Sequence, residues 1–250
     1  MSYCFLIPCY NHSKTLRKTL EKLQIFGFNV IVIDDGSDSD NAALIKSTCA
    51  DFDFVDLHIK QQNSGKGGAV ITGMLLASDK GFSHVIQIDA DGQHNIDDAH
   101  KLIAESKQRP KTLICGRPIY DESIPKHRYY ARYLTHMWVW IETLSFSIPD
   151  SMCGFRIYPV EACKTLLSGS KLGQYMDFDS EIIVRLYWQG VPMVFIPTKV
   201  IYPENGSSNF RALQDNILIS WMHTRLFFGM LVRSPKLISR KIFSSRIEKN

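Results

Sequence analysis

The chain has 250 residues, of which 45% are hydrophobic and 22% charged, which is ordinary for a soluble globular protein with one large domain. Its six cysteines lack the paired spacing of a zinc site, which excludes a zinc-stapled domain and predicts reduced, mostly buried thiols in a cytoplasmic protein. The net charge of +4 is uneven, because residues 225–250 hold seven Lys or Arg and one acidic residue, a balance of +6 that leaves −2 for the rest.

Apolar runs and helical spacing alternate through the first half of the chain. Strands are predicted at residues 3–7, 29–33, 54–59, 84–88 and 112–115. Helices are predicted between them at residues 13–23, 39–49, 65–77 and 96–103. The first run has neither the basic leader nor the length of a signal peptide. The alternation favours an α/β fold with a mostly parallel sheet and helices on both faces.

The second half changes character. Helical patterns are predicted at residues 126–146, 177–189 and 216–232, and short strands at residues 153–157, 191–196 and 199–202, the last two joined across Pro197. No linker or repeat interrupts the chain. We therefore expect a globular domain of residues 1–210 and a helical, basic extension of residues 211–250.

The extension carries an apolar stretch, residues 221–232, followed by Arg233, Lys236, Arg240 and Lys241. The stretch is shorter than the roughly 18 apolar residues of a membrane span. An apolar helix with a basic patch is typical of peripheral attachment to an anionic membrane, here the inner face of the cytoplasmic membrane. A helix packed on the core or against a second copy of the chain is the alternative. Nucleic acid is not expected as a partner, because the basic residues are not interleaved along a folded groove.

Three acidic or glycine-rich turns follow successive strands: Asp34-Asp35-Gly36-Ser37, Gly65-Lys66-Gly67-Gly68 and Asp89-Ala90-Asp91. Each alone could be a solvated turn or a helix cap. The carboxyl ends of parallel strands meet at one edge of a sheet, so together the turns predict a ligand pocket there. Paired carboxylates and the Gln93 side-chain carbonyl are hard oxygen ligands suited to Mg²⁺ or Mn²⁺ shared with a phosphate.

Several other site types fail on residue type. The loop after the first strand, residues 8–12, lacks the Gly-X-Gly-X-X-Gly of a dinucleotide site. No Ser or Thr follows Lys66, as a P-loop requires. Gly92 comes too early for an EF-hand loop.

Six motifs stand in the order seen in family 2 glycosyltransferases, which the chain resembles over residues 3–210: Pro8-Cys9-Tyr10-Asn11, Asp34-Asp35-Gly36-Ser37, Gly65-Lys66-Gly67-Gly68-Ala69, Asp89-Ala90-Asp91-Gly92-Gln93-His94, Gly116-Arg117 and Cys153-Gly154-Phe155-Arg156. The dolichol-phosphate mannosyltransferase-like branch is the most similar. The resemblance implies a GT-A (Rossmann-like) fold, a UDP- or GDP-sugar donor, a divalent metal and inversion at the anomeric carbon.

The resemblance also implies roles for individual residues. The nucleotide sugar is expected to contact Pro8, Tyr10, Asn11, Asp34, Asp35, Lys66, Asp89 and Ala90. The metal is expected on Asp89, Asp91 and Gln93, where it would neutralise charge on the departing nucleoside diphosphate. Lys66 could add to that stabilisation or remain solvated.

The acceptor side rests on arginines and on a third acidic cluster. Arg117, Arg128 and Arg132 are expected to hold a lipid-linked phosphate, for which the guanidinium fork is suited, or the last two belong to an ordinary basic helix. A hydroxyl acceptor would need a general base, and Asp179 is our candidate. Helical spacing places Asp177 and Glu181 together and Asp179 apart, unless the helix begins later and Asp179 lies at its mouth.

The predicted function is that of a metal-dependent, inverting glycosyltransferase that moves a sugar from a nucleotide donor to a lipid-linked phosphate or hydroxyl. Asp91 is expected to be essential to it. Two alternatives are a sugar-phosphate nucleotidyltransferase and a non-catalytic nucleotide-sugar-binding protein at the membrane. Assembly into a homo-oligomer is compatible with each of them.

Overall fold

The computed structural model describes the backbone of residues 1–119, 126–200 and 211–247, and the side chains of residues 1–119, 132–200, 211 and 213–242. Its strands form one sheet in the order β3-β2-β1-β4-β6-β5-β7. Their bounds are β1 Tyr3–Cys9, β2 Asn29–Asp34, β3 Val55–Ile59, β4 His84–Gln87, β5 Leu113–Ile119, β6 Arg156–Pro159 and β7 Met193–Lys199. All neighbours pair in parallel except β6, which runs antiparallel to both β4 and β5. The predicted α/β class is confirmed.

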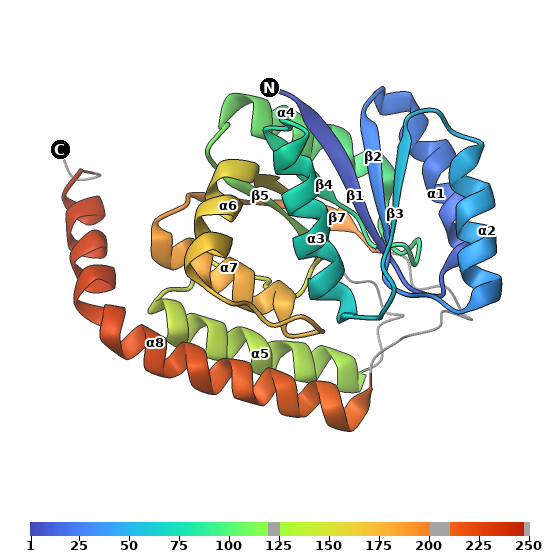
Figure 1. Ribbon diagram of the computed structural model, residues 1–250. Helices are drawn as coiled ribbons and strands as arrows, with labels where there is room; N and C mark the ends of the chain where they lie inside the picture. Colours follow the sequence, from blue (N-terminus) through green and yellow to red (C-terminus); the bar gives the residue numbers. More distant parts are fainter. Residues whose placement is uncertain (120–125, 201–210, 248–250) are drawn as a thin grey trace.

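Helices cover both faces of the sheet (Figure 1). Their bounds are α1 Ser13–Leu23, α2 Ser39–Ala50, α3 Gly65–Asp79, α4 Ala99–Gln108, α5 Lys126–Thr143, α6 Val160–Gly169, α7 Phe178–Gln189 and α8 Ala212–Ile247, with short 3-10 turns η1 Gln24–Phe26 and η2 Ile96–Asp98. Buried residues of α1, α2 and α4 belong to one core cluster, and those of α3, α6, α7 and α8 belong to the other.

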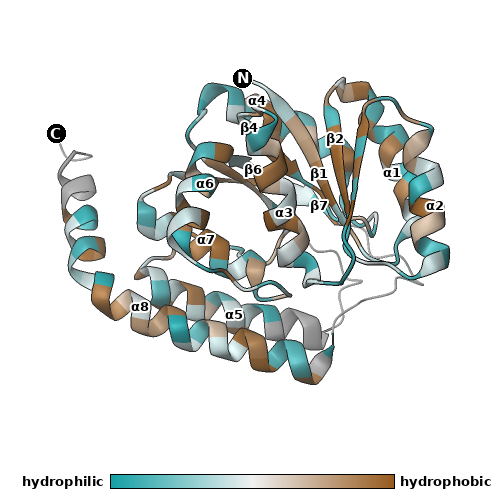
Figure 2. Ribbon diagram, in the orientation of Figure 1, coloured by the Kyte–Doolittle hydropathy of each residue, from teal (hydrophilic) through white to brown (hydrophobic). Residues whose placement is uncertain are grey.

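The buried strand β1 explains why there are two clusters. Successive side chains of a strand point to opposite faces, and Cys4 and Leu6 enter the α3 side while Phe5 and Ile7 enter the α1 side. The central strands are accordingly hydrophobic along their length (Figure 2). Helix α3 lies very close to β1, since a Cβ on Gly73 would fall 2.1 Å from Leu6 Cδ1.

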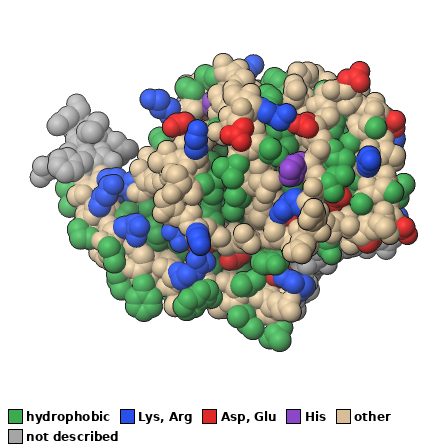
Figure 3. Space-filling view, in the orientation of Figure 1, with side chains coloured by type: hydrophobic (Ala, Val, Ile, Leu, Met, Phe, Trp, Pro, Cys, Tyr) green, Lys and Arg blue, Asp and Glu red, His purple; other side chains and the backbone are tan. Residues whose placement is uncertain are grey.

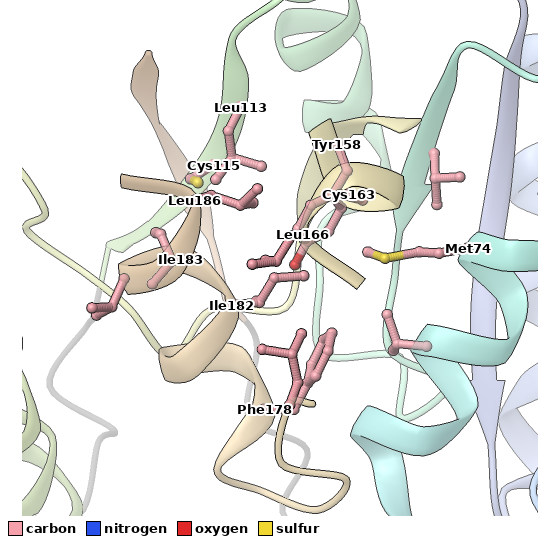
Figure 4. Packing of buried hydrophobic residues seen from close by; sticks show 14 of the residues in the cluster. Met74, Leu113, Cys115, Tyr158, Cys163, Leu166, Phe178, Ile182, Ile183 and Leu186 are labelled. Carbon is pink, nitrogen blue, oxygen red and sulfur yellow. The ribbon is translucent and has the colours of Figure 1, made fainter. Parts of the chain in front are cut away.

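Helix α7 is buried along its length and links the sheet to the outer helices. Phe178 and Ile182 point toward Met74 of α3 and Leu166 of α6 (Figure 4). The sequence did not predict α6, although Val160, Cys163 and Leu166 recur at helical spacing and are its buried residues. The amino end of α7 is therefore held by packing directly beside the start of α3.

Helices α5 and α8 run side by side as an outer layer below α7 (Figure 1). One ion pair between them is almost fully buried: His223 Nδ1 of α8 lies 2.7 Å from Glu142 Oε1 of α5. Met222, Leu226 and Met230 place the inner side of α8 in the main core. None of the described helices is both long and apolar enough to cross a membrane.

One predicted chain break at a proline was wrong, and one predicted helix ended too early. Pro197 does not separate two strands but lies within β7, which is an edge strand, where a missing N–H need not interrupt a ladder. The second predicted strand extends past residue 200, outside the described residues. Helix α8 extends beyond the predicted end at residue 232 and continues through Pro235, where Ser234 Oγ donates to the Leu231 carbonyl that the proline leaves without an N–H donor.

Candidate active site

The predicted turns meet at one edge of the sheet. Strands β1, β2 and β4 are parallel, so Pro8, Asp34 and the Asp89–Asp91 turn all lie at or just beyond their carboxyl ends. The amino end of α3 arrives at the same edge after β3. The structure thus brings the nucleotide-sugar candidates of the first half together, as parallel strands require.

The Asp34–Asp35 turn is held from within the protein. Asp34 is fully buried, and its Oδ1 accepts a hydrogen bond from the Ser37 N–H at 3.1 Å while its Oδ2 has no hydrogen-bond partner among the described residues. Asp35 accepts from the Ser64 N–H and hydroxyl and from the Lys60 ammonium at 2.7 Å. These contacts fix the turn against the residues that precede α3.

The loop after β1 supports the same turn. Pro8 is buried in β1 opposite Ile33, and Tyr10 lies half-buried just beyond the strand. Asn11 adopts a left-handed conformation with φ of 55°. Its N–H donates to Ser37 Oγ, and its side-chain carbonyl accepts from the Asp38 N–H. Asn11 therefore shapes the candidate nucleoside pocket through the backbone of the neighbouring turn.

Lys66 joins two carboxylates at the centre of the edge. Its ammonium lies 2.9 Å from Asp89 and 2.7 Å from Asp179 Oδ2, and it is mostly buried. Asp179 reaches it because α7 begins at Phe178, which places Asp179 in the first turn of that helix. The later of the two helix starts considered for this segment is therefore the observed one, and Lys66 is ion-paired inside the site.

These charges shift one another's pKa values. Burial alone would raise the pKa of Asp89, but Lys66 and His94 hold that pKa well below its ordinary value. Burial would lower the pKa of Lys66, and the charges of Asp179 and Asp89 raise it instead. The pKa of Asp91 is raised by burial and by the negative charge of Asp89. Asp91 thus lies next to a like charge and, within the described part of the chain, forms no ion pair of its own, which suits a site that binds a cation.

The donor set fits a metal that is shared with substrate. Among the described residues, no three acidic, histidine or cysteine side chains form a cluster that would hold a metal by themselves. Asp89 and Asp91 with the Gln93 carbonyl would supply only part of a coordination sphere. Mg²⁺ sites of this kind take their remaining ligands from phosphates and water. The backbone N–H of Gln93 donates to Asp91 Oδ1 at 3.0 Å, which orients that carboxylate, and Ala90 is buried between the two acids.

Three residues of the site were in the quoted motifs but received no role from the sequence. His94 Nε2 lies 3.4 Å from Asp89 Oδ2. Gly154 approaches so closely that a Cβ there would fall 2.8 Å from both Asp89 Oδ2 and the Lys66 ammonium. Arg156 is fully buried and donates to the carbonyls of Asp179 and Ser151 at 2.8 and 2.7 Å. Their membership in two of the quoted motifs, residues 89–94 and 153–156, was the only available signal.

The acidic residues at the start of α7 have separate surroundings. The Asp177 carboxylate accepts the N–H of Tyr175, and burial raises its pKa. Glu181 is fully buried, where it accepts from the Gly173 N–H at 2.7 Å and pairs with Arg185 and Arg225. Of the three, Asp179 is the one that contacts the Lys66–Asp89 pair.

The structure does not bring the arginines expected at the acceptor site together in the way it brings the residues of the acidic turns together. Arg117 is exposed on β5. The side chain of Arg128 lies outside the described residues. Arg132 donates through Nε and Nη2 to both oxygens of buried Asp150, at 2.7 and 2.8 Å. Asp150 also accepts from the N–H groups of Met152 and Cys153, so the Arg132 pair braces the loop that carries Gly154.

Comparison with known proteins identifies the family. The family model described as glycosyl transferase family 2 matches residues 4–167. The chain belongs to this family. It is therefore a glycosyltransferase, and the resemblance seen in its ordered motifs is confirmed.

Relatives support the predicted branch. UDP-N-acetylglucosamine–dolichyl-phosphate N-acetylglucosaminyltransferase of Methanococcus voltae is 26% identical over 243 residues, covering 91% of this chain and 94% of that protein. Dolichyl-phosphate beta-glucosyltransferase of Homo sapiens is 28% identical over 214 residues, covering 76% of this chain and 64% of that protein. The enzyme thus spans just under two thirds of the human relative's length.

Solved structures confirm the GT-A fold. Glucosyl-3-phosphoglycerate synthase of Mycobacterium tuberculosis superposes with a TM-score of 0.65 at 12% identity, over 93% of this chain and 80% of that one. S. aureus TarS 1-349 in complex with UDP-GlcNAc superposes with a TM-score of 0.60 at 14% identity, over 93% and 72%. At these identities the likeness concerns the fold alone.

Proposed function

We propose that the enzyme transfers a sugar, with inversion, from a UDP-sugar to a lipid-linked phosphate. The observation that carries the proposal is the convergence of Asp89, Asp91, Lys66 and Asp179 at the carboxyl edge of the parallel strands. The relatives named above act, by their names, on dolichyl phosphate, and the Methanococcus voltae enzyme is named for a UDP-sugar. Family membership favours sugar transfer over the nucleotidyltransferase alternative.

Each residue of the site has a task in this reaction. The turns at Asn11 and at Asp34–Asp35 would receive the nucleoside, and Asp89, Asp91 and Gln93 would hold Mg²⁺ or Mn²⁺. When bound, the metal supplies Lewis-acid stabilisation of the departing nucleoside diphosphate. The Lys66 ammonium, fixed at the first turn of α3, would add a second positive charge beside the leaving group.

A phosphate acceptor removes the need for a general base. An ionised phosphate is already a nucleophile, whereas a hydroxyl must lose a proton during transfer. Asp179 is held by the Lys66 ammonium, and its backbone carbonyl is held by Arg156. We therefore assign Asp179 to the positioning of Lys66 and reserve the role of base for the case of a hydroxyl acceptor.

A product assay tests the function. The full chain would be incubated with UDP-sugars, Mn²⁺ and either a polyprenyl phosphate or the corresponding polyprenol, and lipid products followed by mass spectrometry. We expect a glycosyl phosphate lipid and stoichiometric UDP with the phosphate acceptor only. Donor binding without UDP release would indicate a non-catalytic protein, and a product with polyprenol alone would overturn the phosphate assignment.

The outer layer supports a location at the membrane surface. Helix α8 exposes Leu213, Ile217, Trp221, Phe228 and Val232 on one side, opposite the residues that enter the core. The lower edge in Figure 3, where α5 and α8 lie in Figure 1, is correspondingly lined with hydrophobic side chains. An apolar stripe of this length on the outside of a soluble helix is typical of an interfacial helix.

The basic residues of α8 contribute less to this surface than their number suggests. Arg225 pairs with Glu181, Arg233 lies over the ring of Trp188, and Arg240 donates to the carbonyl of Tyr187. Lys236 and Lys241 are exposed. We therefore propose that apolar contact, supplemented by a small number of charges, attaches the enzyme to the cytoplasmic face of the membrane.

Liposome flotation tests this attachment. Changing both Trp221 and Phe228 to Ala should reduce binding to anionic vesicles at least about tenfold, because both side chains are exposed and their burial in lipid is lost. The matched control is Ile25→Ala, which removes an equally exposed apolar side chain from η1 on the α1 side of the sheet. Unchanged flotation of the double variant, or equal loss with Ile25→Ala, would contradict the assignment.

A further inference from the structure

The Lys66 ammonium contacts the Asp89 carboxylate, on which the proposed metal site depends. It lies 2.9 Å from both Oδ1 and Oδ2 of Asp89 and 2.7 Å from Asp179 Oδ2. His94 approaches Asp89 Oδ2 from another side, at 3.4 Å. Asp89 Oδ2 thus has hydrogen-bond partners in Lys66 and His94, whereas Oδ1 is in ion-pair contact with Lys66 but accepts no hydrogen bond within the described part of the chain.

A divalent cation at Asp89 would need the same oxygens. An ammonium in contact with the carboxylate and a divalent cation on it repel each other strongly at such short range, particularly where little water screens them. The ammonium has a second partner on its other side, because Asp179 can hold it when Asp89 is taken. From its one position Lys66 contacts both carboxylates, so it can give up Asp89 and keep Asp179.

The surroundings leave the ammonium few other directions. Gly154 closes the side of the pair so tightly that even a methyl group there would fall 2.8 Å from the Lys66 nitrogen. The backbone of Lys66 is equally fixed, because Gly67 beside it packs against Phe178 and Gly68 donates its N–H to the Gln174 carbonyl at 2.9 Å. Movement toward Asp179 is the direction that retains an ion pair.

We propose that Lys66 is a tethered cation that competes with the divalent metal for Asp89, and that Asp179 is a positioning residue that determines how readily Lys66 gives up its contact with Asp89. The inference rests on the proposed metal-dependent function. In this arrangement the charge of Asp89 is compensated before the donor arrives, and Lys66 would keep its contact with Asp179, beside the leaving group, when it gives up Asp89 to the metal. Competition from Lys66 then lowers the affinity of the enzyme for the metal alone, so that tight metal binding requires the donor diphosphate as well.

Direct metal binding tests the competition without an activity readout. Free Mn²⁺ would be measured by electron paramagnetic resonance at fixed pH, on the full chain without nucleotide, for the wild type, Lys66→Met and Asp179→Asn. We expect Lys66→Met to bind Mn²⁺ about fivefold more tightly or better, and Asp179→Asn to bind it about fivefold more weakly. When Asp179→Asn is added to Lys66→Met, Mn²⁺ affinity should change by less than about twofold relative to Lys66→Met alone, since Asp179 acts through Lys66.

Lys60→Met is the matched control. It also removes a mostly buried ammonium from this edge of the sheet, but one that pairs with Asp35 instead of Asp89, so Mn²⁺ affinity should change less than about twofold. Equal or weaker binding by folded Lys66→Met, or unchanged binding by Asp179→Asn, would overturn the competition. If no variant binds Mn²⁺ even with UDP present, the metal assignment of the proposed function falls together with it.

Discussion

Asp91→Asn is expected to lower sugar transfer about 1,000-fold, which corresponds to about 4 kcal/mol of transition-state stabilisation. The amide keeps the shape of the side chain and an oxygen that can accept from the Gln93 N–H, but it removes the charge that a metal and diphosphate require. Transfer would be measured as UDP release with saturating donor and lipid phosphate.

The fold should tolerate this change. The pKa of Asp91 is raised by burial and by Asp89, so the ionised carboxylate opposes folding at neutral pH and its removal should leave the melting temperature equal or higher. Asp97→Asn on η2 removes the same charge from an exposed position nearby and should retain full activity. Normal turnover by Asp91→Asn would refute the metal assignment, whereas loss of activity in both variants would point to a general charge effect.

Gly67→Ala is expected to destabilise the enzyme by about 2 kcal/mol and to lower its melting temperature by about 4–8 °C. A Cβ at this position would fall 2.5 Å from Phe178 Cβ and 2.8 Å from the Gly173 carbonyl oxygen. Neither can retreat easily, because Phe178 is fully buried and the Gly173 N–H is bound to Glu181. Transfer should also fall about tenfold or more, since the displaced turn carries Lys66.

Gly169→Ala separates steric conflict from the intrinsic effect of the substitution. Gly169 ends α6 with no atom within 4 Å of an added Cβ and without a positive φ. Its change to alanine should be neutral or stabilising by up to about 1 kcal/mol. Thermal unfolding followed by circular dichroism compares the two variants, and a Gly67→Ala enzyme as stable as Gly169→Ala would show that α3 and α7 do not meet as closely as the structure has them.

The first half of the fold could be predicted from the sequence for a physical reason. Buried parallel strands produce continuous apolar runs, and the turns that follow them must lie at one edge whatever the rest of the chain does. The Asp34, Lys66 and Asp89 turns could therefore be grouped from their positions after successive apolar runs. The family resemblance supplied their chemistry.

Contacts between distant segments could not be found in this way. Nothing in local pattern pairs Lys66 with Asp179, which follows it by more than one hundred residues, or Arg132 with Asp150. The antiparallel course of β6 is equally invisible, since a short apolar run has no direction. The prediction at Pro197 was wrong because the effect of a proline in a strand depends on whether the strand lies at the edge of the sheet, which tertiary structure decides.

Glu181 gives the outer helix a significance beyond the proposed membrane attachment. This one buried carboxylate is shared by Arg225 of α8, by Arg185 of α7 and by the Gly173 N–H, whose loop packs on the first turn of α3. Without α8, Glu181 would lose one of its cationic partners and Glu142 would lose His223, and leaving these buried carboxylates with fewer partners should destabilise the enzyme. The smallest active form of the enzyme should accordingly include α8, and exchanging this helix between relatives would alter the catalytic centre as well as the proposed membrane contact.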